Sequence, residues 1–317
     1  MAQIRGVHHV ALGVSDLEKM IAFYGEVLGF SVVLARIEES AKPPMRAVTR
    51  TSSVVFGGAL LLREAGGFQL EMIRMTDPAP RPIRANSHYG DIGVNKIVCG
   101  EPNLERFCQE HSAQLPFCTQ PRWIELPGGL TYGFVYCRDP EGNLVELVTC
   151  PDVGEQIPLC GARWVGISVT DLERSLDFYQ HQLGLDRVVI PPHDGFSGCL
   201  DEVSGYSGTK ARSCLLGSSL AQMGEGLVEL FEVSAPRGRA LPFAALWGDF
   251  GYLQTCFLQN NARAAAERLT KAGIEFLCAH TVAEGGPSGP PGEFFYIKDP
   301  DGIPLEQLYV PSGGASE

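Results

Sequence analysis

The chain repeats its own sequence, and this repeat restricts its fold more than any other feature does. Residues 8–30 align without a gap with residues 163–185, and nine of the 23 positions are identical. A second repeated pair, 134–148 and 294–309, shares Phe, Tyr, Asp-Pro, Gly and Glu in register. The sequence therefore predicts a tandem duplication, with its joint in the turn-rich stretch 151–161.

Each half begins with a strand followed by a helix. Residues 8–16 alternate at the period of a strand, and the apolar residues from Leu17 to Leu28 then follow helical spacing. Asp16 is the predicted N-cap of this helix, and Gly29 ends it. Strand-like segments follow, at 31–37, 53–63 and 68–74.

The same order restarts within the first half at "VNKIVCG", with a second helix from Asn103. Three further strands are predicted there, at 117–126, 132–138 and 143–149. The second half repeats both units. We therefore predict an α+β fold of four βαβββ units, in two modules at 1–152 and 160–311.

The composition of the 317 residues limits the setting in which the chain works. Hydrophobic residues make up 44% and charged residues 20%, as in ordinary globular proteins. No apolar run approaches the roughly 18 residues of a membrane span, and we see no secretory signal. Ten scattered cysteines without a CxxC pair suit a reducing cytoplasm. The net charge of −12 disfavours nucleic acid and anionic membranes as partners.

The repeated motifs resemble a known superfamily. Each module opens on text like "HVALGVSDL" and closes on D-P-[ED]-G followed by Glu, as in the vicinal oxygen chelate proteins. That superfamily includes glyoxalase I, ring-cleaving dioxygenases, methylmalonyl-CoA epimerase and the bleomycin- and fosfomycin-resistance proteins. The resemblance implies paired units whose sheets curl around a cleft, with a metal held by first and last strands.

Strand alternation separates the two adjacent histidines. His8 shares a face with Val10 and Leu12, so we expect it to pack under the helix. His9 shares the other face with Ala11, where small residues leave room above the sheet. His9 also stands seven residues before Asp16, where the resemblance implies a metal ligand. The competing interpretation is that both histidines satisfy only local hydrogen bonds.

The same register gives the equivalent positions in the other units. Counting seven residues back from each predicted cap gives the first-strand series His9, Lys96, Trp164 and Gln254. The last strands contribute Glu71, Glu146, Glu229 and Glu306. Imidazole, carboxylate and amide oxygen suit a divalent cation, whereas an ammonium or an indole does not. The four glutamates can also be read as an inherited vestige that faces solvent or an internal partner.

Two pairings of the units remain open from the sequence. If unit one pairs with unit two, the set is His9, Glu71, Lys96 and Glu146. If unit one pairs with unit four, it is His9, Glu71, Gln254 and Glu306, which matches in kind the one His, one Gln and two Glu of glyoxalase I. The complement of the second set is then an inactive site in which Lys96 pairs with an acid.

The resemblance favours a metal-dependent enzyme of the glyoxalase I type, a lyase or isomerase. One divalent ion (Zn, Ni, Co, Mn or Fe) at His9, Glu71, Gln254 and Glu306 would bind adjacent oxygens of a small substrate, such as an aromatic compound or a glutathione adduct. Glu306 is the expected base, with Glu71 second.

Two other functions stay open. One is an Fe(II) hydroquinone-type dioxygenase using His9, Glu306 and either Gln254 or Glu71. The other is a metal-free protein that sequesters an aromatic ligand. Three insertions, at 35–53, 191–213 and 284–293, are candidate lids over the cleft. A monomer suffices for either pairing within one chain, and a homodimer is compatible with both.

Overall fold

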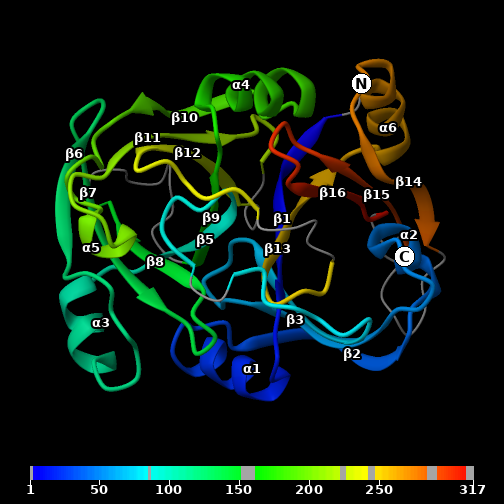
Figure 1. The fold of residues 1–317 in the computed structure, drawn as a ribbon, viewed down its shortest axis with the longest axis horizontal. Coiled ribbons are helices and arrows are strands. Elements are labelled where there is room, and N and C mark those ends of the chain that lie inside the picture. The colour runs from blue at the N-terminus through cyan, green and yellow to red at the C-terminus, as the bar shows by residue number, and fades with distance from the viewer. Residues whose placement is uncertain are drawn as a thin grey trace, which may run out of the picture.

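The structure is a computed structural model that describes residues 3–84, 87–150, 161–221, 226–241, 247–283 and 291–311. It has the predicted α+β architecture of four βαβββ units, arranged as two eight-stranded sheets (Figure 1). The predicted joint lies outside the described residues except for Gly161. The module bounds at 1–152 and 160–311 therefore stay a prediction. None of the described helices is long and apolar enough to cross a membrane.

The first sheet, sheet A, takes its strands from both ends of the chain. Four come from unit one: β1 (Ile4–Gly13), β2 (Val32–Ala41), β3 (Val55–Leu62) and β4 (Gln69–Asp77). Four come from unit four: β13 (Gly251–Gln259), β14 (Phe276–Ala283), β15 (Gly292–Lys298) and β16 (Pro304–Tyr309). Their order across the sheet is β14-β15-β16-β13-β1-β4-β3-β2.

Sheet B is built in the same way from the two middle units. Unit two supplies β5 (Gly93–Gly100), β6 (Arg122–Leu126), β7 (Leu130–Arg138) and β8 (Leu144–Thr149). Unit three supplies β9 (Gly161–Ser168), β10 (Arg187–His193), β11 (Lys210–Gly217) and β12 (Leu227–Ala235). The order is β10-β11-β12-β9-β5-β8-β7-β6, so sheet B repeats the topology of sheet A.

These orders settle which units pair. β1 runs antiparallel to β13, and the two strands lie side by side at the centre of sheet A (Figure 1). β5 runs antiparallel to β9 in sheet B. Unit one therefore pairs with unit four and unit two with unit three, and the alternative pairing of unit one with unit two is wrong.

One helix in each unit begins at the predicted cap. The helices are α1 (Leu17–Glu26), α3 (Leu104–His111), α4 (Leu172–Asp177), which continues as the π-helical turn η3 (Phe178–Leu183), and α6 (Ala262–Lys271). Each cap side chain accepts a hydrogen bond from the backbone N–H three residues later; the caps are Asp16, Asn103, Asp171 and Asn261. The shared cap fixes where each first strand ends, and so keeps the four units in one register.

The Asp-Pro turns tie the two units of each half together. Tyr24 of α1 donates a hydrogen bond to Asp139, at 3.0 Å, and Tyr179 of η3 donates to Asp299, at 3.1 Å. Both aspartates also accept backbone N–H groups of their own turns. The helices pack on one face of the sheets, in a core that includes Val10 and Leu12. The opposite faces carry the candidate site and its counterpart.

Candidate metal centre

Four neighbouring strands place the predicted ligands on one face of sheet A. Cross-strand pairing sets Ala11 of β1 against Gln254 of β13 on one side and Glu71 of β4 on the other. Two residues along, His9 pairs with Cys256 of β13, and Cys256 pairs with Glu306 of β16. Alternation then directs the side chains of His9, Gln254, Glu71 and Glu306 to the same face, as predicted for His9.

The four side chains meet. Nε2 of His9 lies 3.4 Å from Oε2 of Glu71 and 3.2 Å from Oε2 of Glu306. The Gln254 amide Nε2 donates to the same oxygen of Glu306, at 2.8 Å, and to the Tyr296 hydroxyl, at 3.1 Å. One imidazole, one amide and two carboxylates thus converge from four different strands.

One atom in this cluster is buried without any partner, and another is held by ion pairs alone. Oε1 of Gln254 has no partner, and Nε2 of His9 has no well-aligned hydrogen bond but lies within ion-pair distance of both carboxylates. His9 is 6% exposed and Gln254 is fully buried, so water does not solvate either side chain freely. Unpaired buried polar atoms are costly and rare in folded proteins. An imidazole nitrogen and an amide oxygen beside two carboxylates are a donor set that fits a divalent cation.

The electrostatics of His9 reflect its acidic surroundings. Burial alone would lower its pKa, but contacts with Cys256, Glu71 and Glu306 outweigh burial and raise the pKa of His9 well above 6.5. In the absence of a metal, the imidazole therefore holds its proton and is itself the cation between the two carboxylates. A divalent ion that binds here must displace that proton.

His8 does not lie where strand alternation predicts. β1 has a bulge at this point, so His8 has no partner residue on β13. Val7 pairs with Phe257 and His9 pairs with Cys256, and His8 is the extra residue between them. The His8 ring lies against His9, with the two Nδ1 atoms 2.9 Å apart, and is not part of the apolar core. Burial, followed by the charges of His9 and Arg5, lowers the pKa of His8 to about 3, so it stays neutral.

Cys256 is a member of the site that sequence reasoning missed. Its strand "QTCFL" predicts a small buried hydrophobe, and Cys256 is indeed buried. Ligand atoms of His8, His9 and Cys256 nevertheless lie within 4.8 Å of one another, close enough to hold a metal. Burial, with Glu306 nearby, raises the pKa of the Cys256 thiol. The signal was its position two residues after Gln254, which puts both on one strand face.

The other four predicted positions converge in sheet B. Lys96 Nζ contacts Glu146, lies 2.9 Å from Oε2 of Glu229, and donates to the Tyr136 hydroxyl. The Trp164 indole donates to Glu229, at 3.1 Å. This confirms the predicted pairing of Lys96 with an acid. Burial would lower the pKa of Lys96, but Glu146 and Glu229 raise it, so the ammonium persists.

The sheet B cluster is closed and internally satisfied. Glu146 accepts hydrogen bonds from the hydroxyls of Tyr132 and Tyr136, and Glu229 accepts one from Ser213. Lys96 is fully buried, with its Nζ between 5.2 and 5.3 Å from the centres of three aromatic rings, those of Tyr89, Tyr136 and Phe231. None of its charged atoms is among the described buried atoms that lack a partner.

Two of the three candidate lids lie within the described residues, one against the sheet A cleft and the other against its counterpart in sheet B. The insertion 35–53 contains the short helices η1 (Pro43–Met45) and α2 (Arg46–Thr49), and Val48 packs into the apolar cluster on the sheet A cleft. The insertion 191–213 contains α5 (Asp201–Ser204), and its Phe196 fills the sheet B side against Tyr132 and Phe134. Most of the third insertion, 284–290, lies outside the described residues.

Comparison with known proteins agrees with this architecture. The sequence profile of the Glyoxalase/Bleomycin resistance protein/Dioxygenase superfamily matches residues 6–147 and again 161–306. The chain therefore belongs to this superfamily. A search of curated proteins finds no match.

Solved structures show the same fold at low sequence identity. Glyoxalase I from Zea mays is 19% identical, covers 98% of this chain and 92% of its own, and superposes with a TM-score of 0.60. A point mutant of that enzyme gives 0.63 at the same identity and coverage. A putative dioxygenase from Bacillus subtilis is 12% identical, covers 98% of this chain and 87% of its own, and gives 0.53. At such identities the likeness establishes the fold and leaves the reaction open.

Proposed function

We propose that the protein is a metal-dependent enzyme that binds two adjacent oxygens of a small substrate and moves a proton, in the manner of a glyoxalase I-type lyase or isomerase. The observation that carries this proposal is the convergence of the His9 imidazole, the Gln254 amide and the carboxylates of Glu71 and Glu306, in which Oε1 of Gln254 is buried without a partner. These four residues would hold one divalent ion of Zn, Ni, Co, Mn or Fe. When bound, that ion would act as a Lewis acid on the substrate oxygens.

The glutamates are the groups that can accept the proton. His9 and Gln254 both lie against Oε2 of Glu306, so the other oxygen of this carboxylate is the one that remains to take a proton from the substrate. Glu71 is the second choice, and its side chain is the more exposed of the two, at 19% against 10%. The amide of Gln254 fixes the carboxylate of Glu306, which pre-orients the base.

An Fe(II) dioxygenase of the hydroquinone type is the second candidate. His9 and Glu306, with Gln254 or Glu71, supply one imidazole where the usual facial triad has two. His8 is adjacent, but its Nδ1 is turned to the Nδ1 of His9 rather than to the carboxylates. The donor set therefore favours redox-neutral chemistry. A metal-free binding protein is the third candidate, and it leaves the buried, unpaired Oε1 of Gln254 unexplained.

Metal binding by the purified full-length chain tests the proposal. We expect one divalent ion per chain, detected by elemental analysis and calorimetry, and its loss in His9→Ala. His181→Ala is the matched control, because His181 is exposed and pairs only with Asp177, its neighbour one helical turn away. Anaerobic turnover with exchange of a substrate proton for solvent deuterium would support the isomerase. Oxygen uptake with bound iron would instead support the dioxygenase, and a chain that binds no metal would overturn both.

The setting of the protein follows from the same residues and is also a proposal. We expect a small-molecule ligand, no nucleic-acid or membrane partner, and a monomer or homodimer. The nine described cysteines are all free, which supports a reducing, cytoplasmic location.

A further inference from the structure

A cavity beside the candidate metal centre is lined by one of its four residues, Gln254. It has a volume of about 250 Å³, and His9, Glu71 and Glu306 are not among the residues that line it. Apolar side chains form most of its walls: Val48 of α2, Ile83, Leu241, Trp247, Leu253, Leu277 and Pro304. The Trp247 ring packs edge-to-face on Phe56, with centres 4.9 Å apart, which stiffens this wall.

Two buried polar atoms among the residues around this cavity are unpaired. Oε1 of Gln254 is one, and the indole Nε1 of Trp247 is the other, with no hydrogen-bond partner among the described residues. Trp247 is 8% exposed. A ligand that offers an acceptor oxygen to the indole N–H would satisfy a group that the protein leaves unpaired. This points to an oxygen-bearing ligand rather than a hydrocarbon.

The volume limits the size of the ligand. A dry cavity of about 150 Å³ takes benzene, so about 250 Å³ corresponds to roughly ten non-hydrogen atoms. The tripeptide glutathione alone is about twice that size. The enclosed part of the cavity therefore suits a compact molecule, about one ring and its substituents, and a glutathione adduct would extend beyond its mouth.

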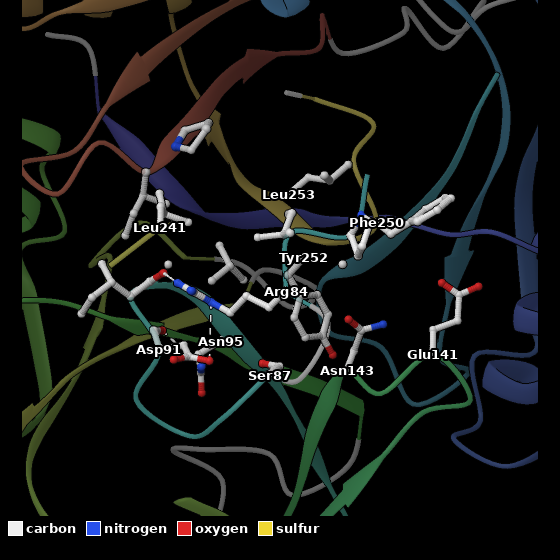
Figure 2. Close-up of a pocket in the computed structure, with 18 residues that line it drawn as sticks. Arg84, Ser87, Asp91, Asn95, Glu141, Asn143, Leu241, Phe250, Tyr252 and Leu253 are labelled. Atoms are coloured by element: carbon white, nitrogen blue, oxygen red, sulfur yellow. Dashed lines mark hydrogen bonds and ion pairs between the residues drawn. The ribbon is translucent and has the colours of Figure 1, made fainter. Parts of the chain in front are cut away.

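An adjoining second cavity adds little room for an apolar ligand. It holds about 90 Å³ and shares four wall residues with the first: Ile83, Leu241, Leu253 and Pro304. Figure 2 shows polar side chains gathered around it, among them Arg84, Asp91, Asn95 and Asn143. Oδ1 of Asn95 is buried and unpaired there. A space of this size and polarity suits about three water molecules.

One cation at the mouth of the larger cavity has no short ion pair among the described residues. Arg50 follows α2 and lines the cavity in the left-handed region, at φ 56°, alone among the described residues other than glycine. The acid that its charge acts on is Glu275, whose pKa Arg50 helps to lower after the larger effect of Lys298. The other charged residues at this mouth are occupied: Lys298 by Glu275, at 2.6 Å, and Asp301 by Thr170 and Arg174.

We propose that the sheet A cavity binds a compact monoanion, with two adjacent oxygens at the Gln254 end, an apolar body of about ten non-hydrogen atoms, and a negative group beside Arg50. The inference rests on the proposed function, because the same four ligands would hold the ion that takes the adjacent oxygens. It narrows the substrate class by size and charge, and it favours a compact anion over a glutathione adduct.

Calorimetry under anaerobic conditions with three probes tests this class. 3,4-Dihydroxybenzoate has the adjacent oxygens, the ring and the distant carboxylate; catechol lacks the carboxylate; S-methylglutathione is the oversized anion. We expect Arg50→Gln to weaken 3,4-dihydroxybenzoate binding about tenfold and to leave catechol binding unchanged. Arg46→Gln is the matched control, because Arg46 is an exposed cation on the same helix that does not line the cavity.

Several outcomes would overturn the ligand class. They are unchanged binding of 3,4-dihydroxybenzoate in Arg50→Gln, an equal loss in Arg46→Gln, or S-methylglutathione competing with higher affinity than 3,4-dihydroxybenzoate. Titration of the divalent metal alone separates the two proposals. If the metal binds and the small anion does not, the ligand class is wrong and the metal centre stands. If the metal does not bind and the small anion still depends on Arg50, the ligand class stands and the metal-dependent function is wrong.

Discussion

Sheets A and B carry the same site in two different states. Each has two carboxylates on its last strands: Glu71 and Glu306 in sheet A, Glu146 and Glu229 in sheet B. In sheet B the chain supplies its own cation, and Lys96 is held there by both acids. In sheet A the first-strand residue is His9, whose cationic form can give up its proton to make room for a metal.

The difference between the two sites shows how a potential metal-binding site can become part of the packed protein interior. Two buried acids need a positive charge, and that charge can be permanent and covalently attached or exchangeable. Sheet B adds Tyr132, Tyr136, Trp164 and Ser213 as donors, and none of the charged atoms of its cluster is among the described atoms that lack a partner. In the sheet A site, Oε1 of Gln254 stays unpaired. A duplicated fold can thus retain one exchangeable site and stabilise itself with the other.

Removing the Lys96 ammonium, the permanent cation of sheet B, is expected to have the largest effect on the free energy of unfolding. Lys96→Met leaves Glu146 and Glu229 buried without their positive partner, and breaking a buried ion pair in this way costs about 3–5 kcal/mol of unfolding free energy. His9→Met in the metal-free protein should cost less than about 2 kcal/mol, because Glu71 is partly exposed. Urea denaturation measures both.

The rescue variant for this experiment removes the acids as well. Lys96→Met combined with Glu146→Gln and Glu229→Gln should recover at least half of the lost stability, because the amides keep acceptors for Tyr132 and Trp164. Equal costs for Lys96→Met and His9→Met would show that the two sites do not differ as described.

The increase in unfolding free energy on adding a divalent metal should come from binding at the sheet A site alone. A ligand at about 1,000 times its Kd stabilises the folded state by about 4 kcal/mol, so saturating divalent metal should raise the unfolding free energy by that order. Glu306→Gln should lose the increment, because it removes a charged ligand. Lys96→Met, where it folds, should retain it. Thermal and urea unfolding with and without chelator give the increments, and a metal increment lost in Lys96→Met would place the ion in sheet B.

Much of this contrast could be predicted from residues that lie close together in sequence. The caps at Asp16, Asn103, Asp171 and Asn261 set a common register, and counting back seven residues found His9, Lys96, Trp164 and Gln254. The periodicity of strands and helices and the repeated Asp-Pro turns fixed the four units. These signals are local, so they survive without knowledge of the tertiary arrangement.

The remainder depended on contacts between distant segments. Whether β1 pairs with a strand of unit two or unit four is decided by the packing of whole sheets, which one strand does not encode. The bulge that turns His8 toward His9 arises only where β1 meets β13, so alternation gave the wrong face. Cys256 entered the site by the same pairing. These features depend on contacts between distant segments, so they could not be predicted from any one segment of the sequence.

Gly166 offers a smaller test of how closely the two sites correspond. Gly166 of β9 faces Lys96 as Cys256 of β13 faces His9, and a Cβ at Gly166 would lie 2.5 Å from Cγ of Lys96. Gly166→Ala should therefore cost about 1–3 kcal/mol through overpacking. In a Lys96→Ala background, which lacks the Cγ, Cδ and Cε atoms that the added methyl group would meet, the extra cost should shrink. Cys256→Ala should cost about 1 kcal/mol. An additive double variant would contradict the contact.

The smallest expected difference is one of pH dependence in the metal-free protein. The pKa of His9 is raised above its unfolded value of about 6.5, so the stability that it contributes is complete below pH 6.5 and is lost as pH rises through the folded pKa. The pKa of Lys96 is raised as well, but from an unfolded value near 10.4, so its contribution persists through the neutral range.

Unfolding free energies measured with chelator from pH 6 to pH 9 test this prediction. The native protein should lose at most about 1.4 kcal/mol per pH unit above pH 6.5, and His9→Gln should lose less. Metal affinity should rise over the same range, because the ion competes with one proton for Nε2. Identical slopes for the native protein and His9→Gln would mean that His9 is not the exchangeable cation of sheet A. The difference between the His9 and Lys96 sites would then be supported only by the arrangement of their side chains.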